Sequence, residues 1–182
     1  TITAATANTA NTIVLRDASG DFSAGAITAG GILNGNANGV GNIGSSTGYF
    51  NTVFAKATSA EYADIAEIYA SDADYAPGTV LIFGGSAEVT ISNEDASPRV
   101  AGVVSTNPAH LMNSNADGVA VALTGRVPTH VVGQVRKGDM MVATKDGQAR
   151  AEASPAMGTV IGKALEDFDG THGTIEVVVG RL

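Results

Sequence analysis

Two short runs place carboxylates on alternate residues of expected turns. Asp72 and Asp74 flank one alanine, and Asp167 and Asp169 flank one phenylalanine before Gly170. Oxygen ligands at alternate positions of a turn are typical of Ca²⁺ sites. Neither run has the full twelve-residue loop with its closing glutamate, and aspartate also favours turns because it bonds its own backbone. We therefore expect no metal and no other cofactor, with these four aspartates as the alternative Ca²⁺ candidates.

Other residue types that could perform chemistry are scattered. His110, His130 and His172 lie far apart, and no Gly-x-Ser-x-Gly elbow exists, so the sequence predicts no catalytic triad. Residues 39–44 spell Gly-x-Gly-x-x-Gly, but turn signals precede them and Ser-Ser-Thr-Gly follows, which indicates β-turns and not a dinucleotide site. The absence of cysteine excludes thiol nucleophiles, disulfides and cysteine-ligated metals.

The charge of the chain is concentrated in one segment. The net charge is -8, and residues 58–98 hold eight Asp and Glu but no Lys or Arg. We interpret this segment as a solvated acidic face, with a cation site or a partner contact as alternatives. A pI near 4.6 argues against sequence-independent binding to nucleic acid. No apolar run approaches the ~20 residues of a membrane-spanning helix, so we expect no membrane insertion.

The C-terminal part of the chain predicts a compact β-barrel or roll head over residues 77–182. Short apolar runs recur there at close spacing, and Asp146-Gly147 is a hairpin signal. Pro128 forces an edge or a bulge because it cannot donate to a strand ladder. The expected strands cover residues 79–83, 87–91, 100–105, 119–123, 126–132, 140–144, 159–165 and 174–179.

The N-terminal part, residues 1–57, predicts a thin stem. It is rich in Thr, Ala, Gly and Asn, with short β-like runs at 12–15 and 26–28 and turn signals such as Asp17–Gly20 and Asn38-Gly39 between them. Its apolar residues recur but are too sparse for one chain to bury. Several copies wound together could bury them along a shared axis, so we expect an intertwined oligomeric stem. The chain starts at Thr1 without Met or a basic leader, and we interpret it as a fragment.

Residues 58–76 form the expected junction between stem and head. Ser59 can cap a helix, and Tyr62, Ile65 and Tyr69 share a helical face at i, i+3 and i+7. We predict a short helix here, with an extended hinge as the alternative. Aromatic residues gather around this segment, where we expect them to pack the junction: Tyr49, Phe50, Tyr62, Tyr69 and Tyr75.

Several stretches resemble bacteriophage tail fibres. TANTIVLRDASGDFSAGAITA (9–29) is similar to the repeat of fibre shafts, and GNIGSSTGYFNTVFAKA (41–57) to the segment before their C-terminal domains. ADIAEIYASDADYAPGTVLIFGG, followed by AGVVSTNPAHLMNS, resembles the C-terminal intramolecular-chaperone domain of phage neck appendages and tail fibres. GRVPTHVVGQVRKGDMMVATKDGQARA and GTVIGKALED are similar to fibre C-terminal domains as well.

The resemblance implies a homotrimeric virion protein at the tail fibre tip. Such fibres attach to host surface polysaccharide or to an outer-membrane receptor. We therefore expect a structural and adhesive protein, not an enzyme, that holds three chains in register. A cellular adhesin or surface-layer protein with the same kind of stem is the rival class.

The resemblance also carries an enzymatic alternative, a chaperone domain that trimerises the fibre and then releases itself by self-cleavage. The positions that match are Asp64 and Glu67 in one segment and Ser105 and Asn107 in another. Self-cleavage needs a hydroxyl or amide nucleophile and a carboxylate that moves a proton. The simpler interpretation is that the carboxylates are solvated or lie at trimer contacts, and that Asn107-Pro108 makes a turn.

Recognition of a polysaccharide commonly uses aromatic platforms and hydrogen-bonding side chains. Loops on a rigid scaffold carry such contacts, which makes residues 111–117 and 154–158 candidates. From the first loop we take Asn113, Asn115 and Asp117 as candidates for receptor contact.

Overall fold

The computed structural model describes residues 3–5, 12–36, 40–56 and 58–180. The chain divides into two compact units, Thr1–Ala55 and Lys56–Leu182. The described residues form strands, turns and loops and contain no helix, so the expectation of a mainly β protein is confirmed. They accordingly include no helix that could cross a membrane.

The N-terminal unit contains little regular structure in its described residues. β1 (Thr3–Ala5) pairs in parallel with β2 (Thr12–Val14). The expected turn at Asp17 is present, because its carboxylate accepts from the backbone N–H groups of Ser19 and Asp21, both at 2.9 Å. The expected strand at 26–28 is not formed. The expected Asn38-Gly39 turn, and the first glycine of the 39–44 motif, lie outside the described residues.

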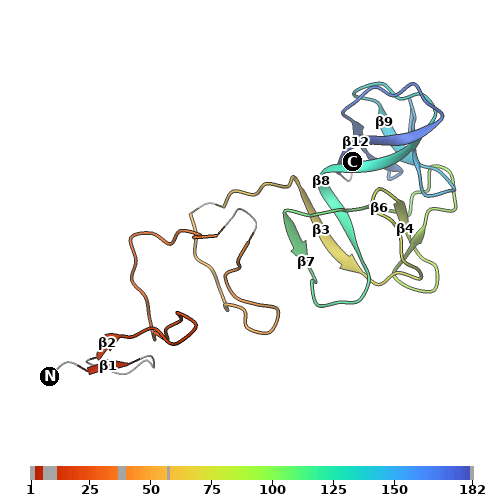
Figure 1. Cartoon of the computed structure of the whole chain (residues 1–182). Coiled ribbons are helices and arrows are strands. Elements are labelled where there is room, and N and C mark those ends of the chain that lie inside the picture. Colours follow the sequence, from red (N-terminus) through yellow and green to blue (C-terminus); the bar gives the residue numbers. More distant parts are fainter. Residues whose placement is uncertain (1–2, 6–11, 37–39, 57, 181–182) are drawn as a thin grey trace. The chain divides into compact units, whose positions relative to one another are not determined.

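The C-terminal unit begins with a sheet around the first half of a long strand. β3 (Asp64–Tyr69) pairs antiparallel with β8 (Val119–Val132) and parallel with β7 (His110–Met112). β6 (Val100–Val104) pairs with β8 as well, and β4 (Val80–Phe83) and β5 (Val89–Ile91) continue beyond β6. Figure 1 shows β3, β6 and β8 in this part of the unit.

The second half of β8 enters a closed barrel. β9 (Met140–Ala143), β10 (Ala149–Ala151), β11 (Val160–Ala164) and β12 (His172–Gly180) follow in the chain. Neighbouring strands pair in the order β8, β12, β11, β9 and β10, and a parallel pairing of Ala149 with Val131 returns β10 to β8. The head is therefore a five-stranded barrel joined to an open sheet through one shared strand.

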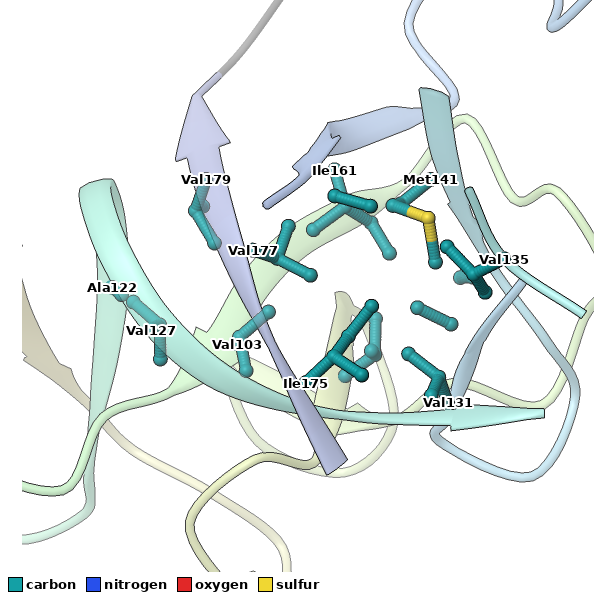
Figure 2. Close-up of a cluster of buried hydrophobic side chains, with 14 residues drawn as sticks. Val103, Ala122, Val127, Val131, Val135, Met141, Ile161, Ile175, Val177 and Val179 are labelled. Atoms are coloured by element: carbon teal, nitrogen blue, oxygen red, sulfur yellow. The ribbon is translucent and has the colours of Figure 1, made fainter. Parts of the chain in front are cut away.

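Buried and exposed side chains alternate along the barrel strands, and the buried ones form the core of the barrel. In β12, Ile175, Val177 and Val179 are buried while Glu176 and Val178 between them are not. Successive side chains of a strand point to opposite faces, so the branched residues fill the interior. Figure 2 shows Val131 of β8 and Met141 of β9 in the same cluster as these residues. A second cluster lies in the open sheet and consists of Leu81, Val89, Ala101, Val104 and Val121.

The expected helix in residues 58–76 is wrong, because its centre is strand β3. Asp64 and Ala66 are buried and Ile65 between them is exposed, which is the two-residue period of a strand. The helical spacing of Tyr62, Ile65 and Tyr69 reflects only residues that are close together in the sequence. It is overridden because β3 gains backbone partners on both sides from β7 and β8, which lie far along the chain.

The structure also bears on three predictions about the strands of the head. β9 and β10 form a hairpin around Gly147, as Asp146-Gly147 predicts. The expected strands 119–123 and 126–132 are one continuous strand, β8. Pro128 lies opposite Glu176 of β12, and in the described chain no strand pairs with it on the other side of β8. The proline is thus tolerated at a local edge.

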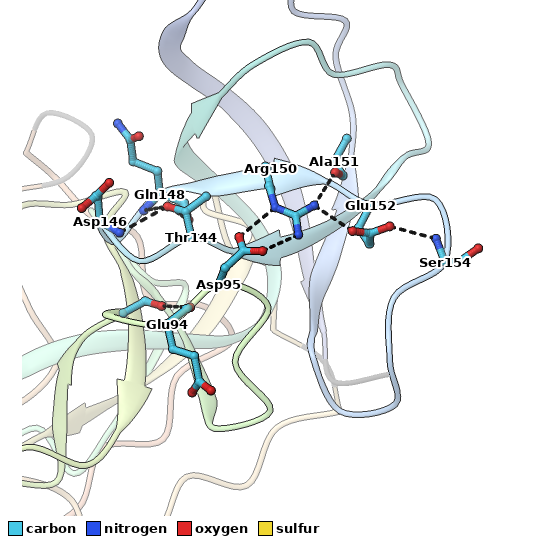
Figure 3. Close-up of polar contacts among 10 residues, drawn as sticks. Glu94, Asp95, Thr144, Asp146, Gln148, Arg150, Ala151, Glu152 and Ser154 are labelled. Carbon is cyan, nitrogen blue, oxygen red and sulfur yellow. Dashed lines mark hydrogen bonds and ion pairs between the residues drawn. The ribbon is translucent and has the colours of Figure 1, made fainter.

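An arginine on the barrel holds a loop of the open sheet. Arg150 of β10 donates from Nε and Nη2 to the two carboxylate oxygens of Asp95, at 2.8 and 2.7 Å. Its Nη1 donates to Glu152 at 2.8 Å (Figure 3). These hydrogen bonds lower the pKa of the Asp95 and Glu152 carboxyl groups below their ordinary values. The contact therefore ties the two halves of the head together.

Candidate functional site

A cavity of about 330 Å³ in the head collects three of the four residues that the self-cleavage hypothesis names. Asp64 begins β3, Ser105 follows β6, and Asn107 lies in the connection between β6 and β7. The remaining lining residues come from the segment before β3 and from loops and strands farther along, and are Glu61, Tyr62, Ala63, Thr106, Arg126, Val127, Pro128 and Glu176.

Backbone hydrogen bonds fix the walls of this cavity. The Ser105 N–H donates to the carbonyl of Ala120 in β8 at 2.8 Å. The Ala109 N–H donates to the Asp64 carbonyl at 2.8 Å, so both ends of the loop that carries Asn107 are held by strands. Because these contacts do not depend on the lining side chains, those side chains can be changed without removing the scaffold.

A glycine allows β8 to pass closely beside Asp64. Gly125 has a φ of +112°, a backbone conformation that other residues adopt with strain. A Cβ at this position would lie 2.1 Å from the Ala63 carbonyl oxygen and 2.6 Å from the Asp64 Cα. The close approach brings the next residue of β8, Arg126, to the same cavity as Asp64.

Asp64 is an unusual residue at the start of a strand. It is only 5% exposed, and its Oδ2 has no hydrogen-bond partner within the described part of the chain. An unsatisfied buried acceptor destabilises a fold by about 1–3 kcal/mol. Ser105, which lines the same cavity, is also buried at 7% exposure. Asp64 therefore leaves an acceptor that the described part of the chain does not satisfy.

The other polar lining residues are exposed, except Glu176, which is half-buried. Tyr62 is 52% exposed, and Asn107 and Arg126 are exposed as well. No hydrogen bond or ion pair joins the Arg126 guanidinium to another side chain among residues 58–180. Three acidic residues, Glu61, Asp64 and Glu176, line the cavity together with this one arginine. The cavity thus combines an aromatic ring, several acceptors and several donors, with an excess of negative charge.

Glu67 does not belong to this cavity. It lies three residues from Asp64 in β3, and residues an odd number apart in a strand face opposite sides. Its Oε2 accepts a hydrogen bond from the Tyr69 hydroxyl at 2.9 Å. Of the two carboxylates proposed for self-cleavage, the structure therefore brings only Asp64 to Ser105 and Asn107.

The first pair of Ca²⁺ candidates lies at a second hollow. Asp72 and Asp74 line a cavity of about 510 Å³ together with Asp117. Asp72 accepts a hydrogen bond from the Tyr75 hydroxyl, and this bond is the largest cause of the lowered pKa of the Asp72 carboxyl group. Across the described ranges, no three His, Asp or Glu side chains are arranged to hold a metal ion.

The second pair of Ca²⁺ candidates anchors a turn. Asp167 accepts from the backbone N–H of Lys137 at 2.8 Å, and Asp169 forms an ion pair with Arg136 at 2.7 Å. The same contact raises the pKa of Arg136 above its ordinary value. These two carboxylates therefore interact with protein groups of the 136–139 turn.

The loop proposed for receptor contact is exposed but partly held by the sheet. Asn113 has a φ of +54°, and its side-chain amide donates to the Ile68 carbonyl at 3.0 Å. Asn115 is exposed, and Asp117 lines the second hollow. Of the three residues, only Asp117 lines one of the cavities described above.

Sequence reasoning did not select Tyr62, Arg126 or Glu176 as site residues. Tyr62 was expected to pack the junction, but it lines the cavity and is half exposed. Arg126 and Glu176 reach the cavity because β8 and β12 pair antiparallel, a register that no local motif encodes. No family model matches this chain, and no curated protein matches it.

Proposed function

We propose that this chain is the C-terminal part of a homotrimeric phage tail fibre, located at the fibre tip of the virion. In this proposal residues 1–57 form a thin intertwined stem and the β head ends the fibre. The protein is structural and adhesive: it holds three chains in register and contacts a polysaccharide or an outer-membrane receptor on the host surface. It performs no enzymatic turnover in this role.

The exposure of apolar side chains in the N-terminal unit carries the proposal. Leu33 is 93% exposed and Phe54 is 95% exposed in the single chain. Eleven further large apolar residues of this unit are at least 46% exposed: Ile13, Val14, Leu15, Phe22, Ile27, Ile32, Val40, Ile43, Tyr49, Phe50 and Val53. A surface of this kind marks an interaction site.

Further copies of the same chain are the partner that fits this surface. The apolar residues are distributed along the whole unit, so one compact partner cannot cover them all, whereas parallel copies cover equivalent positions in every chain. Each side chain that becomes fully buried between copies contributes about 1.5–3 kcal/mol. The number of three chains comes from the resemblance to tail fibres.

Light scattering on the purified chain tests the assembly. At micromolar concentration we expect a single species with a mass about three times that of the 18.2 kDa chain. A monodisperse monomer would contradict the proposal, since the apolar residues of the N-terminal unit would then remain in water.

A second candidate function, self-cleavage, is favoured by the cavity that Asp64, Ser105 and Asn107 share. The Ser105 hydroxyl would attack a peptide carbonyl of the chain while the Asp64 carboxylate takes its proton. The C–N bond would then break, the amine would leave with that proton, and water would hydrolyse the resulting serine ester to release the second fragment. Intact-mass spectrometry of freshly expressed protein tests this candidate. Self-cleavage predicts two fragments from the original chain and one intact chain for Ser105→Ala and Asp64→Asn.

Glu67→Gln is the matched control for that experiment. It removes a carboxylate from the same strand but from outside the cavity, so cleavage should continue in this variant. One intact mass for the original chain, stable over days, would exclude self-cleavage and leave the adhesive role.

A further inference from the structure

The cavity at Asp64 gathers polar groups that the fold itself does not use. The buried Oδ2 of Asp64 lacks a donor within the described residues, and the Arg126 guanidinium lacks an ion pair there. The Asn107 side chain lies exposed at the same cavity. Buried polar groups in folded proteins are generally hydrogen-bonded, so Asp64 leaves an unused acceptor in the wall of the cavity.

We propose that this cavity binds one residue of a neutral saccharide. The inference rests on the adhesive role proposed above and gives it a site and a ligand class. Sugar hydroxyls both donate and accept, so one ring can donate to the accessible carboxylates of Glu61 and Glu176 while it accepts from Arg126. No bond of the ligand is formed or broken.

The apolar part of the lining fits the same ligand. The Tyr62 ring, at 52% exposure, offers a flat apolar surface at the cavity. Val127 and Pro128 line it as well, and they can contact the C–H face of a sugar ring. The volume of about 330 Å³ lies at the lower end of the ~300–1,000 Å³ range of small-molecule sites, which suits a single ring.

The net negative charge of the lining residues disfavours binding of an acidic ligand. Glu61, Asp64 and Glu176 outnumber Arg126, so a carboxylate or a phosphate would meet net repulsion. The absence of a metal-binding group of three among the described side chains speaks against a bare cation. A neutral, hydroxyl-rich ligand satisfies donors and acceptors without adding charge.

Saturation-transfer difference NMR on the whole chain tests the site. The probes are glucose, galactose and N-acetylglucosamine, with glucuronic acid as the acidic comparison, each titrated through the millimolar range. We expect binding of at least one neutral sugar and at least tenfold weaker binding of glucuronic acid. Absence of binding by all three neutral sugars, or preferential binding of glucuronic acid, overturns the proposal.

Variants of exposed residues place the sugar in the cavity. Tyr62→Ala removes the ring and should weaken binding about tenfold, whereas Tyr62→Phe keeps the ring and should retain it within about threefold. Arg126→Ala should also weaken binding, while Arg99→Ala, an exposed arginine that does not line the cavity, should not. Sugar binding that survives both Tyr62→Ala and Arg126→Ala overturns the assignment.

Failure of the sugar-binding inference can be distinguished from failure of the fibre proposal. A trimer that binds no neutral sugar would overturn this inference and leave the fibre proposal intact. A monomer that binds sugar through Tyr62 would contradict the fibre proposal and support the site.

Discussion

The two units of this chain use similar apolar residues in opposite ways. In the head, Val177 and Leu81 are fully buried within a single chain. In the N-terminal unit, Ile32 and Leu33 are 82% and 93% exposed. The head spaces its branched residues on alternate positions of paired strands, whereas Gly, Asn and Ser separate those of the N-terminal unit. Spacing along the chain, more than composition, therefore decides whether an apolar residue finds a partner in its own chain.

The difference implies two sources of stability. The head has its own core, so it should unfold with a free energy that does not depend on protein concentration. In the proposed fibre the N-terminal unit gains burial only from further copies, so we expect its order to depend on concentration. Substitutions in the N-terminal unit and in the head should therefore affect different properties, assembly in the first case and stability of the single chain in the second.

The largest effect is expected from removing apolar area from the N-terminal unit. The double variant Leu33→Ser and Phe54→Ser loses two side chains that we expect to be buried in each of three copies, at about 1.5–3 kcal/mol for each side chain. Sedimentation velocity should then show a monomer at concentrations where we expect the original chain to be a trimer. Met157→Ser is the matched control, because Met157 is 97% exposed but lies in the head.

An unchanged trimer in the double variant would break the comparison, since the exposed residues of the N-terminal unit would then not mediate assembly. Dissociation caused by Met157→Ser alone would place the interface in the head instead.

The next effect concerns the core of the head. Leu81 is 0% exposed, and Leu81→Ala should lower the free energy of unfolding of the head by about 2–5 kcal/mol because it leaves a cavity. Urea titration followed by circular dichroism measures this change. The midpoint should not shift with protein concentration. A midpoint that rises with concentration would show that the head also depends on other copies.

The smallest effect is expected at the ion pair between the barrel and the 94–97 loop. The Asp95 side chain is more than half exposed, so Arg150→Ala should destabilise the head by about 1 kcal/mol or less at pH 7. Hydrogen bonds from Arg150 lower the pKa of Asp95 and Glu152 below their ordinary values of 3.8 and 4.5. The stabilisation is therefore complete above those values and is lost as the pH falls through the lowered ones.

Thermal melts of the original chain and of Arg150→Ala between pH 7 and pH 2 test this dependence. The difference between the two melting temperatures should shrink as the solution becomes acidic. Arg99→Ala, which removes a more exposed pair with Glu94, should have a smaller effect at neutral pH. A difference that is constant with pH would show that Arg150 acts through packing alone.

The strand pattern of the head was largely predictable from the sequence. Short branched runs, the Asp146-Gly147 hairpin and the edge position of Pro128 all follow from local chemistry. Strands β3 and β7 were not predicted, and β10 was implied only as the second arm of the hairpin, without bounds. β7 and β10 have three residues each and carry little periodicity, and β3 has a helical spacing that only its distant partners override.

The candidate site was predictable only in part. Asp64, Ser105 and Asn107 followed from the resemblance to a phage domain, and the structure places all three at one cavity. Arg126 and Glu176 could not be selected, because their proximity depends on the register between β8 and β12. Glu67 was selected with Asp64 by nearness in sequence, and the alternation of a strand separates them.

A tryptophan reporter tests the central claim most directly, that the apolar residues of the N-terminal unit are buried between copies. The chain contains no Trp, so Phe54→Trp introduces a single fluorophore at a position that is 95% exposed in one chain. We predict emission and resistance to acrylamide quenching typical of a buried indole at high concentration, and a change to a solvent-exposed signal on dilution. A solvent-exposed signal at every concentration would contradict the account.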